Sequence, residues 1–219
     1  MSTQRKKFQA VIFDMDGVIT DSEPLYAEAL NEVLRSGGHV MTDQDHESIM
    51  GSGIDFTLDW MISHFGLKGT VASWRPRYDR EVVRVLSQKA EPTPGIYDLL
   101  DALNARHMKI GLASSSQGNW VQAVLKKLGV ADRFEAIAAC EMVAQAKPAP
   151  DLYLLAAQKL GVAPAACVAI EDTPRGIAAG KAAGMRMIAL RTGPTAGLDI
   201  SAADHIIDSL PAFPLHWLD

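Results

Sequence analysis

Two aspartates stand two positions apart near the N-terminus, directly after a short apolar run. They are Asp14 and Asp16, and the run occupies residues 10–13. In an extended segment residues i and i+2 point to the same side, so both carboxylates are presented together. A second acidic pair, Glu171 with Asp172, follows another apolar run. Such pairs are suited to proton transfer and to binding a cation.

A hydroxyl cluster and one lysine occupy comparable positions along the chain. Ser114, Ser115 and Ser116 follow an apolar run at residues 110–113 and precede a helical pattern. Hydroxyls and backbone N–H groups at the start of a helix can donate to an anion. Lys147 lies in a proline-rich segment between the third and fourth apolar runs. These groups could together hold a phosphate.

Each of these features has a simpler explanation when taken alone. An aspartate after a strand is most often a turn residue or a cap, serines before a helix are usually caps, and a lone lysine is usually solvated. A D-x-D-G segment also occurs as a fragment of calcium-binding loops. The combination is hard to obtain from capping alone, because the C-terminal ends of parallel strands share one sheet edge, where α/β folds bind ligands. We therefore expect a functional site at this edge.

The grouped carboxylates predict a bound metal ion. Three or four carboxylates close together repel one another unless a cation lies among them. Hard oxygen ligands favour Mg²⁺ over zinc, and no histidine or cysteine cluster accompanies them in the sequence. Mg²⁺ with a lysine and hydroxyl donors suits a phosphate dianion, and it removes the repulsion that opposes attack of a carboxylate on phosphorus. The pattern therefore predicts phosphate chemistry through a covalent aspartyl-phosphate.

Five short apolar runs must position these groups. None shows two-residue alternation, which is typical of strands buried on both faces of a parallel sheet. Helical patterns separate the later runs, and alternating strands and helices predict an α/β fold with right-handed crossovers. The runs cover residues 10–13, 110–113, 136–139, 167–170 and 187–190, and the helical patterns residues 96–103, 120–128, 152–160 and 174–184.

One connection is too long for a simple crossover. More than ninety residues separate Phe13 from Met108, whereas a crossover needs one helix and short loops. The excess carries helical patterns and little strand signal, and residues 88–95, with two prolines and a glycine, are typical of a return linker. We therefore expect a mostly helical insertion at about residues 24–90.

The composition is that of a globular protein with its own core. The chain has 219 residues, of which 48% are hydrophobic and 21% charged, with a formal net charge of −5. This balance offers no broad basic field, so nucleic acid is not expected as a partner. No apolar stretch is long enough for a membrane span or a signal peptide, so we expect a soluble, cytoplasmic chain. Cys140 and Cys167 stand in apolar surroundings and are expected to be buried thiols.

The ordered motifs resemble those of the haloacid dehalogenase superfamily. Residues 13–24 (FDMDGVITDSEP) resemble its first motif, residues 112–115 (LASS) the second, residues 147–151 (KPAPD) the third and residues 170–177 (IEDTPRGI) the fourth. The resemblance spans residues 8–23 and 93–210. Within the superfamily, the chain more narrowly resembles the small-cap branch that contains β-phosphoglucomutase and sugar-phosphate phosphatases. It implies a Rossmann-like doubly wound parallel sheet at residues 1–23 and 91–219, with a helical cap domain at residues 24–90 inserted after the first strand.

The resemblance also implies roles for individual residues. Asp14 is implied as the nucleophile, and Asp16 as the general acid/base that protonates the leaving oxygen and then deprotonates the hydrolytic water. It implies Mg²⁺ held by the Asp14 carboxylate, the Asp16 backbone carbonyl and Asp172, with Glu171 close by or acting through water. The implied phosphate-binding residues are Gly17, Ser114, Ser115 through its backbone N–H, and Lys147.

The cap separates a phosphatase from a mutase. In the mutases of this branch a histidine lies two residues into the cap helix, where this chain has Tyr26. Their cap also has an arginine shortly after a glycine, whereas Gly51 here begins an uncharged to slightly acidic stretch that reaches Phe56. This stretch of the cap thus lacks the fixed cation that would bind a second phosphate, which favours a phosphatase over a phosphohexose mutase. Tyr26, Gly51 and Phe56 are candidate substrate contacts, and a sugar or polyol phosphate is the expected substrate class of a monomeric enzyme.

Two other classes of protein share parts of this site. Dehalogenation occurs on the same fold, but it needs no metal and so leaves Asp16 and the pair of Glu171 and Asp172 unexplained. A receiver-like signalling module also joins an acidic Mg²⁺ site to a phosphorylated aspartate, a hydroxyl and a lysine. Such modules are one small domain without a large insertion after the first strand, so a hydrolytic enzyme is favoured.

Overall fold

The computed structural model describes residues 8–35, 37–49, 52–193 and 195–219. The chain divides into two compact units. One unit joins Met1–Asp21 to Glu91–Asp219, and we call it the sheet unit; the other is Ser22–Ala90, which we call the helical unit.

The sheet unit is built on one parallel sheet. Its strand order is β3-β2-β1-β4-β5-β6, and every neighbouring pair is parallel. The strands are β1 (Ala10–Phe13), β2 (Lys109–Ala113), β3 (Ala136–Ala138), β4 (Cys167–Glu171), β5 (Arg186–Leu190) and β6 (His205–Ile207). The five apolar runs are confirmed as strands, each within one residue of its expected bounds at either end. Burial on both faces explains the absence of alternation, because all four residues of β1 are buried.

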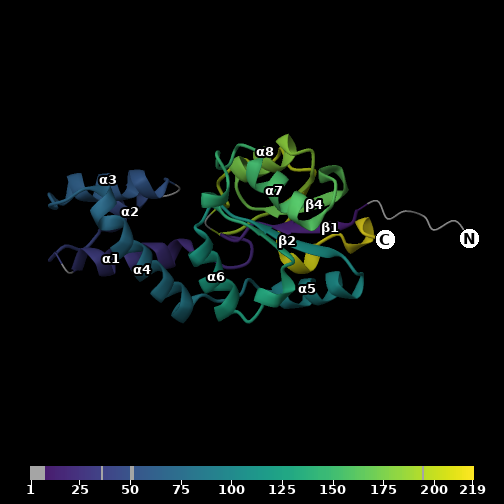
Figure 1. The fold of residues 1–219 in the computed structure, drawn as a ribbon, viewed down its shortest axis with the longest axis horizontal. Helices are drawn as coiled ribbons and strands as arrows, with labels where there is room; N and C mark the ends of the chain where they lie inside the picture. Colours follow the sequence, from purple (N-terminus) through teal and green to yellow (C-terminus); the bar gives the residue numbers. More distant parts are fainter. Residues whose placement is uncertain (1–7, 36, 50–51, 194) are drawn as a thin grey trace, which may run out of the picture. The chain divides into compact units, whose positions relative to one another are not determined.

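Helices cover both faces of this sheet, as a doubly wound fold requires. Figure 1 shows α7 and α8 on one face and α5 on the opposite face, and these helices contact the neighbouring strands. The helices are α5 (Ile96–Ala105), α6 (Gly118–Lys127), α7 (Asp151–Leu160) and α8 (Pro174–Ala182). The small residues of α7 and α8 pack with β1, β4 and β5 in one buried core cluster. The predicted α/β fold is therefore confirmed.

The register of the strands brings the predicted site residues to one edge. Phe13 at the end of β1 is aligned with Leu112 of β2 and Ile170 of β4. Strand order reverses between β1 and β4, since β2 and β3 extend the sheet on one side and β5 and β6 on the other. This is the switch point at which open α/β sheets bind ligands.

The described residues of the helical unit form four helices. They are α1 (Glu23–Arg35), α2 (Asp43–Ile49), α3 (Ile54–His64) and α4 (Val71–Lys89). The buried face of α1 consists of Ala29, Leu30, Val33 and Leu34, a stripe with helical spacing. This stripe packs with α4, whose buried residues include Val82, Val85 and Leu86.

Two smaller findings concern the thiols and the membrane. Cys167 is buried, but Cys140 is only half-buried, so the expectation of two buried thiols is wrong for Cys140. Cys140 lies in a short 3₁₀ turn (Cys140–Met142) after the edge strand β3, where less of the chain covers it. Among the described residues, no helix has both the length and the apolar character needed to cross a membrane.

Candidate active site

The first acidic pair directly follows β1. Asp14 is buried, and its backbone N–H donates to the carbonyl of Ile170 at 2.9 Å, so the pairing with β4 continues one residue beyond the strand. Asp16 is half-buried on the turn that follows. Gly17 has a positive φ of 78°, and a Cβ there would lie 2.0 Å from Oδ2 of Asp172. A glycine is therefore needed where this turn meets the second acidic pair.

Lys147 links the two acidic pairs. Its Nζ donates to Oδ1 of Asp14 at 2.5 Å and to Oε1 of Glu171 at 2.7 Å, and all three side chains are buried. The ammonium also lies 4.9 Å from the ring centroid of Tyr153 on α7, within the range of a cation–π interaction. Arg175 donates to the backbone carbonyl of Lys147 at 2.9 Å, which holds the loop that carries the lysine.

Glu171 is held by the turn between β4 and α8. Its Oε2 accepts the backbone N–H groups of Asp172 at 2.8 Å and Thr173 at 2.7 Å, and the hydroxyl of Thr173 at 2.9 Å. The same hydroxyl caps α8 by accepting the N–H of Gly176, and Pro174 follows at the first position of the helix. Both oxygens of Glu171 are therefore engaged, one by the lysine and one by the turn.

Asp172 has an oxygen to which none of the described residues donates a hydrogen bond. The side chain is buried, and its Oδ1 has no hydrogen-bond partner among the described residues. Its Oδ2 receives a long hydrogen bond of 3.4 Å from the hydroxyl of Thr192, which is itself 2.6 Å from the hydroxyl of Thr195. A buried carboxylate oxygen without a partner is costly, so this oxygen is available to a ligand.

The electrostatics of the cluster show an excess of negative charge. Burial raises the pKa of Asp14 well above its ordinary value, although the Lys147 ammonium acts in the opposite direction. Burial alone would lower the pKa of Lys147, but the two carboxylates beside it hold that pKa well above its usual range. Burial, together with the charges of Glu171 and Asp16, raises the pKa of Asp172 to about 7. One lysine does not balance the carboxylates gathered here.

These residues fit a divalent metal ion. Oxygens of Asp14, Glu171 and Asp172 lie within 4.8 Å of one another, and all three side chains are buried. Hard oxygen donors are the ligands that Mg²⁺ and similar cations take, and Oδ1 of Asp172 provides a ligand atom that no other described residue engages. The donor set and the uncompensated charge both point to a cation.

The serine cluster lies beside Asp16. Ser114 is fully buried, and its hydroxyl is 3.4 Å from Oδ2 of Asp16, while the hydroxyl of Ser116 donates to the same oxygen at 2.8 Å. The side chain of Ser115 is exposed. The structure thus brings together Asp14, Asp16, Gly17, Ser114, Lys147, Glu171 and Asp172 at one edge of the sheet.

The roles of some residues at the site are not predicted from the sequence. The sequence places Ser116 in the hydroxyl cluster but gives it no role of its own, and it gives no role to Thr192 or Thr195. A signal was available, since Thr192 follows β5 at the same sheet edge. The contact of Tyr153 with the lysine carried no sequence signal, because an aromatic residue in a helix usually indicates core packing.

The candidate cap residues belong to the helical unit. Tyr26 lies on α1 and is half-buried, and Phe56 lies on α3 with 56% of its surface exposed. Gly51 lies outside the described residues. Their role in substrate contact stays a prediction.

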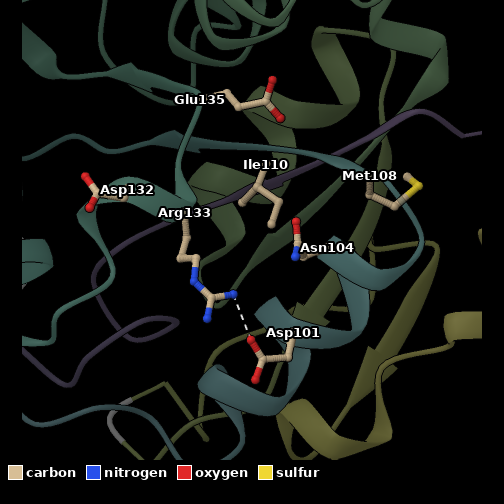
Figure 2. Close-up of a pocket in the computed structure, with 7 residues that line it drawn as sticks. All are labelled: Asp101, Asn104, Met108, Ile110, Asp132, Arg133 and Glu135. Carbon is tan, nitrogen blue, oxygen red and sulfur yellow. Dashed lines mark hydrogen bonds and ion pairs between the residues drawn. The ribbon is translucent and has the colours of Figure 1, made fainter.

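Among the surface cavities lined by described residues, two lie elsewhere on the sheet unit. One has a volume of about 270 Å³, and its lining includes an ion pair between Arg133 and Asp101 of α5 (Figure 2). The other, of about 660 Å³, is lined by residues of β3, α6 and α7. Neither cavity is lined by Asp14, Asp16, Glu171 or Asp172.

Comparison with known proteins identifies the family. Residues 8–184 match the haloacid dehalogenase-like hydrolase model. The chain is 33% identical over 180 residues to the phosphorylated carbohydrates phosphatase of Thermotoga maritima. This alignment covers 82% of this chain and 83% of that protein. It is 36% identical over 200 residues to the β-phosphoglucomutase of Bacillus subtilis, with 88% of each chain covered.

A solved structure shows the same architecture over nearly the whole length. The crystal structure of CbbY from Rhodobacter sphaeroides in complex with phosphate matches with a TM-score of 0.85 at 28% identity, covering 97% of this chain and 99% of that one. The four motifs and the strand-end cluster thus agree with the family match. The chain belongs to the haloacid dehalogenase-like hydrolase family and is a phosphoric monoester hydrolase.

Proposed function

We propose that this protein hydrolyses a sugar or polyol phosphate, with Mg²⁺ and through an aspartyl-phosphate on Asp14. The observation that carries the proposal is the buried contact of Asp14 with Lys147, beside Glu171 and the unpartnered oxygen of Asp172. A carboxylate held next to a fixed ammonium is suited to meet a phosphate dianion. The name of the Thermotoga maritima relative supports the carbohydrate class.

In the first step the Asp14 carboxylate attacks phosphorus and the bond to the leaving oxygen breaks. Asp16, two residues further, gives its proton to that oxygen. Lys147 donates to Asp14 in the structure, and its ammonium is available to the phosphoryl oxygens as charge moves onto them. The hydroxyl of Ser114 and the backbone N–H of Ser115 supply further donors to the same oxygens.

In the second step water attacks phosphorus and Asp14 is released. Asp16, now ionised, accepts a proton from that water and so returns to its starting state. The division into two steps replaces one difficult hydrolysis by two displacements at phosphorus.

The metal site is proposed from the same cluster. Asp14, the backbone carbonyl of Asp16 and Asp172 would hold Mg²⁺, with Glu171 close by or acting through water. When bound, the ion neutralises charge on the phosphate and on the carboxylates. Glu171 serves a further purpose here, because it holds both Lys147 and the turn before α8.

The helical unit, residues 22–90, is proposed as the cap that selects the leaving group. Tyr26 and Phe56 are its candidate contacts. A phosphohexose mutase is the alternative, and the relative from Bacillus subtilis is named a β-phosphoglucomutase. Tyr26 stands where the mutases have a histidine, which favours the phosphatase.

The test is a hydrolysis panel that follows release of inorganic phosphate. The panel contains glucose 6-phosphate, fructose 1-phosphate, sorbitol 6-phosphate, glycerol 3-phosphate and 4-nitrophenyl phosphate, each with Mg²⁺ and with EDTA. We expect Mg²⁺-dependent release from at least one sugar or polyol ester, and a loss of at least about 10⁴-fold in Asp14→Asn, as expected when a covalent nucleophile is removed. No release by the folded wild-type protein would refute the proposal. Isomerisation of β-glucose 1-phosphate, with its bisphosphate added, that outpaces phosphate release would favour the mutase.

A further inference from the structure

The hydroxyl of Ser116 donates a hydrogen bond to the carboxylate of Asp16. The Oγ–Oδ2 distance is 2.8 Å, and Ser116 is only 8% exposed. Ser114 approaches the same oxygen, but at 3.4 Å its contact is weaker. Ser116 therefore makes the shorter of these two serine contacts to Asp16.

The backbone around Ser116 is fixed on two sides. Its N–H donates to Oγ of Ser114 at 2.9 Å, and its carbonyl accepts the N–H of Cys140 at 3.2 Å. The segment after β2 is thereby tied to the segment after β3. These two hydrogen bonds hold the backbone from which the Ser116 hydroxyl reaches Asp16. Asp16 itself is half-buried on the turn after β1.

Capping of α6 does not explain this serine. The residue before the helix is Gln117, and its side chain makes no cap hydrogen bond. The first N–H of the helix, on Gly118, donates instead to the carboxylate of Glu141 at 3.1 Å. The helix start thus has a partner from another segment, and Ser116 is turned toward the acidic turn.

We propose that Ser116 is a positioning residue that sets which oxygen of Asp16 carries the transferable proton. Because Oδ2 accepts the serine hydroxyl, we assign the proton transfer to Oδ1. This inference rests on the proposed function, in which Asp16 serves the leaving group and then the water. In the first step the bond from Asp14 to phosphorus forms, the bond from phosphorus to the leaving oxygen breaks, and the Oδ1 proton moves to that oxygen. In the second step water loses a proton to Oδ1 as its oxygen bonds to phosphorus and Asp14 departs.

The proposal predicts a dependence on the leaving group. A sugar or polyol alkoxide is strongly basic and departs only when it is protonated, whereas 4-nitrophenolate departs without a proton. The ratio kcat/KM reports the steps up to formation of the phospho-enzyme, where this difference is felt. A serine that only supported the fold, or only bound the phosphoryl group, would affect both esters alike.

The experiment compares kcat/KM for 4-nitrophenyl phosphate with that for the fastest sugar or polyol ester of the panel. In Ser116→Ala we expect a fall of about tenfold to a hundredfold for the sugar or polyol ester, part of what a general acid contributes, and less than about threefold for the nitrophenyl ester. Ser116→Thr keeps the hydroxyl and should restore the sugar or polyol ester to within about fivefold of wild type. Ser201→Ala is the matched control. Ser201 is exposed and precedes β6, so it lies toward the amino ends of the strands, whereas the site lies at their carboxyl ends.

The outcomes separate this inference from the proposed function. Equal losses for both esters in Ser116→Ala, or no loss for either, would overturn the role of Ser116 while leaving the phosphatase intact. Failure of Ser116→Thr to restore the sugar or polyol ester, with its melting temperature unchanged, would also overturn it. A folded wild-type protein that hydrolyses neither ester would overturn the proposed function itself.

Discussion

At Gly176 the start of α8 comes so close to Glu171 that no side chain fits between them. A Cβ on Gly176 would lie 1.6 Å from Oε1 of Glu171, the oxygen that accepts the Lys147 ammonium. The glycine has a packing reason, because Gly is otherwise unfavourable inside a helix by about 1 kcal/mol relative to Ala. Its cost in helix propensity is offset by the position it allows Glu171 to take.

We predict that Gly176→Ala lowers both stability and activity. The added methyl group must displace Glu171 from Lys147, and overpacking of this kind costs about 1–3 kcal/mol. We expect a lower melting temperature and a fall in kcat of at least about tenfold, measured by thermal unfolding and by phosphate release. Gly197→Ala is the matched control, because a Cβ at the exposed Gly197 meets nothing within 4 Å. A more stable Gly176→Ala protein, as helix propensity alone would give, would contradict this account of the turn.

At the scale of elements, the strands were predictable because they are buried on both faces. Apolar runs such as that of β1 carry the signal directly. The short strand β6 was missed, since its burial runs from exposed His205 to buried Ile207 and it lacks a continuous apolar run. A three-residue edge strand of this kind forms through pairing with β5, which local sequence does not reveal.

The site residues that lie at strand ends and within the motifs could be predicted from the sequence. Asp14, Lys147 and Asp172 follow from their positions in the motifs and from the shared edge of a parallel sheet. The contact of Ser116 with Asp16 joins residues one hundred positions apart, and serines before a helix are expected to be caps. The sequence likewise could not predict that Oδ1 of Asp172 lacks a partner among the described residues, because this depends on packing in three dimensions.

At the scale of the whole molecule, the charge gathered at the site makes stability depend on pH and metal. Burial, with the neighbouring charges of Glu171 and Asp16, raises the pKa of Asp172 from 3.8 to about 7 in the folded protein. The folded state therefore holds this proton more tightly than the unfolded state does. The resulting stability is fully present below about pH 4 and is lost as pH rises toward 7, at about 1.4 kcal/mol for each unit of pKa difference.

We predict that Asp172→Asn stabilises the metal-free protein at pH 8 and not at pH 4. The amide carries no charge to be desolvated, so the difference in melting temperature between variant and wild type should grow as pH rises through this range. Thermal unfolding in EDTA at both pH values measures it. Added Mg²⁺ should raise the melting temperature of the wild type at pH 8 more than that of the variant, since Asp172 is a proposed ligand. A difference that is the same at both pH values, or a larger metal effect on the variant, would contradict this origin of the pH dependence.

The central claim is that the phosphoryl group passes through Asp14, and its direct test is to find the group there. The wild-type protein is quenched in acid during turnover of its fastest phosphate ester with Mg²⁺, then digested, and the modified peptide is sequenced by mass spectrometry. The account predicts one phosphoryl group on Asp14, removed by hydroxylamine as an acyl phosphate is, and absent from Asp14→Asn. Release of phosphate with the group found on another residue, such as Ser114, or with none found under conditions that preserve an acyl phosphate, would contradict it.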